Sequence, residues 1–248
     1  MSESQLKLYS LGIVTEDKQR NSDYIKVTPI ESLPLQSGPI NQQVSQYNVS
    51  LPDSTGVKRA HQVTGDNHVV AKWIQIGSNN RITAPDVYHG ETVSLYRYAD
   101  TDEYYWTTMF REPSLRKKET VLYGYSNQSG KGNFDKSSSY WAEVSTHDKH
   151  IHIHTSNNDG EPYGYDILLD TSTGKLTIAD TIGNKLELDS SSSSINLTTN
   201  TSVNIKSPTV SIEASDIKLK GNIAIDGDIN STGQATFAGN VNAPNNQM

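Results

Sequence analysis

The last third of the chain repeats a pattern in which two apolar residues flank one polar residue. Within each doublet the period is two, the period of a half-buried β-strand. The spacing between successive doublets falls from 10 residues through 9, 8 and 7 to 6. The pattern predicts very short strands joined by polar corners, and it fades towards the C-terminus. The clearest doublets are Leu176/Ile178, Leu186/Leu188, Ile195/Leu197, Val203/Ile205, Val210/Ile212, Ile217/Leu219 and Ile223/Ile225.

Strands this short cannot supply a core from one chain. Burying one aliphatic side chain stabilises by about 1.5–3 kcal/mol, whereas ordering each backbone residue costs about 1–2 kcal/mol. A single-chain solenoid would need roughly 20 or more residues per coil. One apolar pair per corner instead favours three identical chains wound about a common axis, with the doublet residues in the trimer core. We therefore expect residues 165–248 to form a tapering, intertwined triple-stranded β-helix in a homotrimer.

The first half of the chain alternates apolar and polar residues in longer runs. We expect strands over residues 6–14, 24–27, 43–51, 68–76, 91–98 and 104–110, and at 121–125. The segment Arg81–Gly90 contains a Pro-Asp pair after Ala84 and ends on glycine. This composition is typical of a turn that leads into the next strand. Five or six strands in about 110 residues predict a small closed barrel of OB type. The fold class expected is all-β.

We divide the chain into three parts. Residues 1–125 are the OB-fold-like barrel, 126–164 a loop-rich transition, and 165–248 the needle. The transition contains a predicted hairpin that pairs Tyr140–Val144 with Lys149–Thr155. Composition changes near its end, since residues 166–248 contain one aromatic residue, Phe237, and no arginine.

Composition limits the function classes. Only 33% of the residues are hydrophobic and the net charge is −7, which favours a β-rich chain that completes its core by oligomerising. With no cysteine, disulfides and thiolate metal sites are excluded. No apolar run reaches the length of a membrane span, and the N-terminus has neither the basic nor the apolar region of a signal peptide. We expect synthesis in the cytoplasm without a cleaved leader.

Four segments together resemble a known family. The serine-rich rungs at 186–197 and 203–214 and the end segment 221–233 are similar to the triple-stranded β-helix of phage tail central spikes. Segment 81–93 is similar to the OB-fold that precedes that needle. No single motif is diagnostic; the order of barrel, transition and tapering needle is what carries the resemblance.

The resemblance implies a homotrimeric virion protein on the axis of a contractile tail, below the baseplate. The barrel would bind hub and tail tube proteins, and the needle would puncture the host outer membrane when the sheath contracts. Type VI secretion spikes share this architecture. No cofactor, enzymatic activity or specific nucleic acid is implied for this chain.

Two departures from the family are visible. Some members carry a lysozyme domain between barrel and needle, but here that interval is under 60 residues. Some needles end in a His-x-His tip that binds iron, but Val241–Met248 contains no histidine. Either a separate tip-capping protein covers this end, or the chain ends in its own point.

The most suggestive cluster is His150, His152 and His154, which alternate on one face of a predicted strand. Tripled about an axis, these imidazoles could bind a metal ion. Alternatively, Ile151 and Ile153 face the core and the histidines face solvent, which we favour because isoleucine is easier to bury. In a third interpretation the histidines gain charge below about pH 6.5 and loosen this region.

Two other motifs provide weaker evidence for a functional site. The segment from Gly124 to Gly132 fails the phosphate-loop spacing and lacks the Ser/Thr after its lysine. The basic cluster is interpreted as a solvated loop or a contact with an acidic subunit rather than a nucleic-acid site. Its members are Arg111, Arg116, Lys117 and Lys118.

Two further function classes remain open beside the spike. In one, the rod is a stalk and the barrel is a receptor- or glycan-binding head, as in an adhesin. In the other, the chain is a β-helical polysaccharide lyase, which the lack of arginine and of nearly all aromatics after residue 165 disfavours. Acid pairs such as Asp100 and Asp102 lie in a predicted turn and suggest no catalysis.

Overall fold

The computed structural model describes residues 4–31, 44–52, 58–77, 79–109, 118–126 and 134–239, with the backbone alone for 44–52 and 58–66. The described part is all-β, as predicted, and contains no helix. It therefore has no helix that could cross a membrane. Several sequence predictions lie outside the described residues: Arg111, Arg116 and Lys117 of the basic cluster, the loop at 130–132, and the terminus 241–248.

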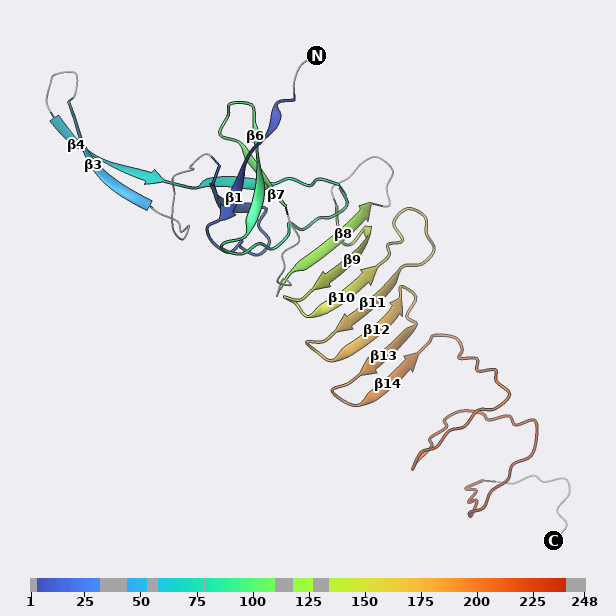
Figure 1. Ribbon diagram of the computed structural model, residues 1–248. Helices are drawn as coiled ribbons and strands as arrows, with labels where there is room; N and C mark the ends of the chain where they lie inside the picture. The colour runs from blue at the N-terminus through green and yellow to red at the C-terminus, as the bar shows by residue number, and fades with distance from the viewer. Residues whose placement is uncertain are drawn as a thin grey trace, which may run out of the picture. The chain divides into compact units, whose positions relative to one another are not determined.

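Five strands close into a barrel, which confirms the predicted small barrel. One of its pairs, β5 with β7, is parallel, and the other pairs are antiparallel. Figure 1 shows several of these strands wrapped around one another. In spatial order they are β1 (Leu6–Val14), β2 (Tyr24–Pro29), β5 (Val69–Trp73), β7 (Tyr104–Thr108) and β6 (Thr92–Tyr98).

The barrel interior is filled by branched aliphatic residues around Trp106, which is fully buried. The indole N–H of Trp106 donates to the carbonyl of Asp23 at 2.9 Å, so its single polar atom is satisfied. Gly12 lets β1 approach this core closely: a Cβ there would lie 2.2 Å from Cγ1 of Val27.

A separate two-stranded antiparallel sheet pairs β3 (Val44–Pro52) with β4 (Lys58–Asp66). The strand predicted at 43–51 is present as β3. Its partner β4 is not among the predicted strands, and neither strand belongs to the barrel.

The second large sheet is a seven-stranded antiparallel meander in chain order. Figure 1 shows its strands side by side from β8 to β14. The predicted hairpin of the transition is present as β9 and β10, and the sheet continues past residue 165 without a break. The strands are β8 (Thr120–Ser126), β9 (Ser139–Ser145), β10 (His150–His154), β11 (Tyr165–Asp170), β12 (Lys175–Asp180), β13 (Lys185–Asp189) and β14 (Ser194–Thr198).

The last three corners of this sheet share one device. An aspartate ends each strand and accepts a hydrogen bond from the backbone N–H two residues later, at 2.8 Å for Asp170, 3.0 Å for Asp180 and 2.9 Å for Asp189. Each is an Asx turn, in which the side chain satisfies the backbone where the strand stops. The same corners contain positive φ angles at Gly174, Gly183 and Ser193.

After β14 the described chain has no further strand. Residues 1–203 form one compact unit and 204–248 another. Strands predicted at the doublets from Val203 to Ile225 are therefore absent from the single chain. A physical reason is that two apolar residues per rung do not offset the ordering cost when no neighbouring strand is present.

Candidate functional site

The surface with the clearest functional character is one face of the seven-stranded sheet. Directly opposed residues on antiparallel strands lie on the same face, so the strand register places two unbroken rows there. We call these two rows the apolar face. The first row is Val121, Val144, Ile151, Leu169, Leu176, Leu188 and Ile195; the second is Tyr123, Ala142, Ile153, Ile167, Ile178, Leu186 and Leu197.

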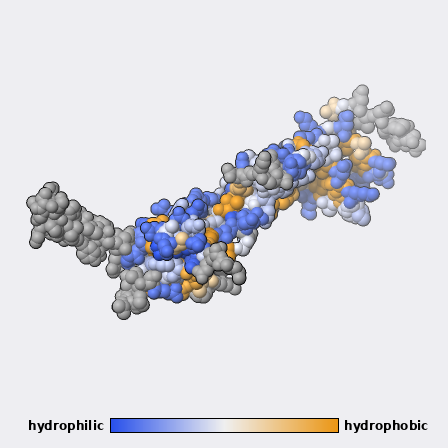
Figure 2. Space-filling view, turned by 90° about the horizontal axis from the view of Figure 1, so that it is seen from above, coloured by the Kyte–Doolittle hydropathy of each residue, from blue (hydrophilic) through white to orange (hydrophobic). Residues whose placement is uncertain are grey.

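Most of this face is open to solvent in the single chain. Ile151 is 41% exposed, Leu188 42% and Ile195 73%. Figure 2 shows hydrophobic residues reaching the surface of the molecule in several places. A contiguous apolar surface of this kind marks an interaction site rather than scattered exposed residues.

The predicted trimer-core residues fall into two groups. Leu176, Ile178, Leu186, Leu188, Ile195 and Leu197 all lie in the two rows of the apolar face. The remaining eight lie in the strandless segment, with exposed fractions from 52% for Val203 to 73% for Ile205: Val203, Ile205, Val210, Ile212, Ile217, Leu219, Ile223 and Ile225.

The part of the apolar face that lies before residue 165 was not predicted from the sequence. The signal was clear only in β10, which alternates strictly, whereas β8 and β9 each contain three consecutive apolar residues. Because these segments were assigned to the barrel and a transition, their apolar residues were not linked to the doublets. The missed residues are Val121, Tyr123, Ala142, Val144, Ile151 and Ile153.

The opposite face of the sheet carries the charges. Lys175 pairs with Asp189 at 3.2 Å, and Lys185 pairs with Glu187 at 2.5 Å. The first pair joins β12 to β13 and the second lies within β13. The two faces of the sheet thus differ sharply in polarity, and the apolar face contains no charged residue.

The favoured prediction for β10 is wrong in the single chain. Ile151 and Ile153 are exposed, and the side chains of His150, His152 and His154 are only 20–23% exposed. The histidines lie on the polar face, where Trp141 packs against two of them: its ring centroid is 4.5 Å from that of His152 and 5.3 Å from that of His154, on which it stacks. The predicted alternation of isoleucines and histidines between the two faces is correct. The prediction of which face the chain itself covers is wrong.

Each of these histidines is paired with a carboxylate. His150 Nε2 lies 2.7 Å from Oε1 of Glu143, while His152 and His154 both lie 2.9 Å from Oδ1 of Asp166. Burial raises the pKa of Glu143, but hydrogen bonds from Lys136 and His150 outweigh this and hold it below the usual value. The pKa of Asp166 is lowered in the same way: burial opposes the shift, and His154 and His152 cause it.

In this arrangement each imidazole is within hydrogen-bonding distance of a carboxylate. The imidazoles are divided between two carboxylates on different strands. Across the described ranges, no group of three or more His, Cys, Asp or Glu side chains is placed to hold a metal ion.

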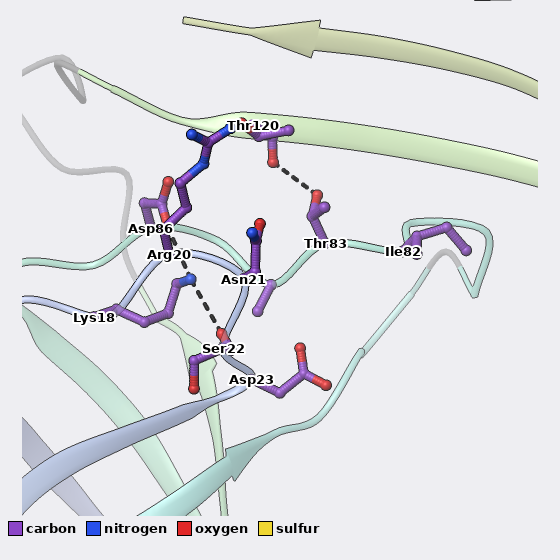
Figure 3. Close-up of a pocket in the computed structure, with 10 residues that line it drawn as sticks. Lys18, Arg20, Asn21, Ser22, Asp23, Ile82, Thr83, Asp86 and Thr120 are labelled. Atoms are coloured by element: carbon purple, nitrogen blue, oxygen red, sulfur yellow. Dashed lines mark hydrogen bonds and ion pairs between the residues drawn. The ribbon is translucent and has the colours of Figure 1, made fainter. Parts of the chain in front are cut away.

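A cavity of about 220 Å³ lies where the loop before β2 meets the 82–86 segment and Thr120 of β8. Figure 3 shows the Lys18 ammonium near Asp86 and Ser22. It lies 2.8 Å from Oδ1 of Asp86 and donates to the carbonyl of Ser22 at 3.1 Å. Since small-molecule pockets are usually about 300–1,000 Å³, this cavity is too small and too internally paired for a ligand site.

The same aspartate connects the barrel region to the sheet. Oδ2 of Asp86 lies 2.9 Å from Nε2 of His147, which is in the turn between β9 and β10. Sequence analysis noted Asp86 only as part of a turn, because its two partners are far away in the chain.

A scan against protein-family models finds no matching family, and a search of curated proteins finds no significant match.

Proposed function

We propose that this protein is the trimeric central spike of a contractile-tail baseplate. In this role it is a structural virion protein that punctures the host outer membrane when the sheath contracts. The observation that carries the proposal is the uncovered apolar face, followed in the chain by apolar doublets that find no partner strand. Three copies around one axis would bury both.

The two parts of the shaft would use different pairing. In β11–β14 the rungs already pair within the chain, so each copy supplies one complete wall of a three-sided prism. After Val203 the rungs have no strand beside them, so there the strands of the three copies would alternate and wind around one another. The closed five-stranded barrel fits the OB-type domain that precedes such a needle.

The partners follow from this arrangement. The barrel end would bind the baseplate hub and tail tube proteins, and the C-terminal end would face the host, with a separate tip-capping protein as a candidate partner. The role is mechanical rather than enzymatic, and no specific nucleic acid takes part in it. A type VI secretion-like spike would use the same geometry.

The first experiment is the oligomeric mass. Light scattering should give about 82 kDa, three times the 27.3 kDa of one chain, and the trimer should persist in SDS until it is boiled. A stable monomer in solution contradicts the proposal.

A second experiment separates the spike from a stalked adhesin. Electron cryo-microscopy of a tailed particle that contains this protein should place the barrel against the hub and the C-terminus farthest from it. An adhesin would instead present the barrel outward, and its isolated residues 1–160 would bind glycans.

A further inference from the structure

The apolar face does not begin at the doublets. Its two rows continue without interruption from β11 through β10 and β9 to β8: Ile151 lies opposite Leu169, and Val144 lies opposite Ile151. The exposed fractions also continue, at 41% for Ile151, 45% for Ile153 and 46% for Val144. The sheet therefore presents one surface, although the composition changes near residue 165.

We infer that the upstream half of this face, on β8, β9 and β10, packs against two further copies of this chain, so that the oligomer interface begins at Val121. The inference rests on the proposed trimer and extends its core by three strands. It also accounts for β10, whose isoleucines are exposed in the single chain although histidines on the other face are covered.

Charge favours a second copy of this chain as the occupant. The protein carries a net charge of −7, so most contacts between identical copies would bring like charges together. The apolar face avoids this, because none of its residues is charged and the ion pairs of β12 and β13 lie on the opposite face. Charge repulsion between the two contacting surfaces therefore does not oppose contact between copies at this face.

Periodicity favours the same occupant. The face repeats one pair of side chains every ~4.8 Å over seven layers. A partner must match that spacing in every layer to exclude water from all of them. Two copies related to the first by a three-fold axis match it by symmetry.

The upstream strands make up a large part of the apolar face. Seven strands span about 29 Å, and β8, β9 and β10 contribute three of the seven layers.

Cysteine cross-linking tests the inference, because the full-length chain contains no cysteine. Ile151→Cys and Val144→Cys place single thiols on the upstream face, and Leu188→Cys places one on the doublets. Thr177→Cys is the control, since Thr177 lies opposite Glu187 on the polar face. Each full-length variant is treated with a short bismaleimide at low protein concentration and analysed on a boiled SDS gel, and its mass is measured by light scattering.

We expect covalent dimers at Ile151 and Val144 in yields similar to Leu188 and several times the yield at Thr177. Dimers at Leu188 without dimers at either upstream position would overturn this inference and leave the proposed spike standing. Equal yields at Thr177 would also overturn it, because the polar face would then meet other copies. Monomeric mass with no cross-link at any position would overturn the proposed function as well. Two upstream positions are used so that misfolding of one variant does not decide the result.

Discussion

At the residue scale, the most consequential contact outside the apolar face is the ion pair of Lys18 and Asp86. The Lys18 side chain is only 2% exposed and that of Asp86 13%, so neither charge is well hydrated. Removing one partner of such a pair leaves a buried charge without compensation, which usually costs about 3–5 kcal/mol.

We therefore expect Asp86→Ala to lower the free energy of unfolding by about 3 kcal/mol, as measured by urea denaturation. The double variant Lys18→Met/Asp86→Ala is the matched control and should regain part of this loss, because it removes the stranded ammonium. A loss below about 1 kcal/mol for Asp86→Ala would mean that the pair behaves like a surface salt bridge.

Asp170 provides a pH-dependent prediction. Hydrogen bonds from Ser172 and Thr173 lower the pKa of its carboxylate from 3.8 to about 2. Since the pKa is lower in the folded state, this group stabilises the fold above about pH 4, and the stabilisation disappears as the pH falls towards 2.

Asp170→Asn should therefore flatten the decline in urea midpoint between pH 4 and pH 2 relative to the unmodified protein. Asp102→Asn is a suitable control, because the Asp102 side chain is 98% exposed. Identical pH profiles for Asp170→Asn and the unmodified protein would show that this corner does not contribute.

Residue patterns in the sequence located β10 but not the side of the sheet on which its residues are covered. Alternation shows that Ile151 and Ile153 share one face and the three histidines the other. It does not show which face the chain itself covers, and burying isoleucine is favoured only where a partner surface exists. Trp141 packs against His152 and His154 from a neighbouring strand, and it lies nine residues before His150 in a separate segment.

At the element scale, the chain divides into strands that pair within one copy and doublets that do not. β11–β14 form hairpins whose corners are fixed by aspartates, so they fold from local contacts. Within the described residues 203–239 the chain keeps the apolar doublets but has neither paired strands nor these aspartate corners.

Hydrogen exchange can test this division. In the assembled protein, backbone amides from Val203 to Ile225 should exchange slowly, because they would pair with strands of other copies. A variant that remains monomeric should lose protection there and retain it in β1 and β6 of the barrel. Rapid exchange of this segment within an assembled trimer would contradict interchain pairing.

The two-stranded sheet shows which strands the alternation of apolar and polar residues can predict and which it cannot. β3 was predictable because Tyr47, Val49 and Leu51 alternate with polar residues. β4 has few apolar residues and was missed, since its pairing with β3 depends on main-chain hydrogen bonds that leave little trace in composition.

At the scale of the whole molecule, the sequence was sufficient to predict the broad architecture, while the homotrimer stays a prediction. The closed barrel and the all-β class follow from strand spacing and turn residues. The extent of the apolar face required the strand register, because residues such as Val121 and Leu188 are far apart in sequence and become part of one row only through four intervening strands.

Removing residues 204–248 should reveal what the last segment contributes to the assembly. We expect the shortened chain to dissociate in SDS without boiling, because its strands pair only within each copy and nothing holds the copies by winding. The full-length protein is the control and should remain trimeric under the same conditions. Equal SDS resistance of both would place the stabilising contacts in the sheet alone.

The meander of β8–β14 has a consequence for how such a protein can change in length. Successive strands run in opposite directions. One added strand would therefore make the chain leave the sheet at the other end of the strands and in the opposite direction. Adding two strands restores the exit position and the direction of the chain, and it lengthens the sheet by about 9.6 Å without changing its width. Length variants that keep the downstream segment in place are therefore expected to differ by an even number of strands, so the length of the sheet would change in steps rather than continuously.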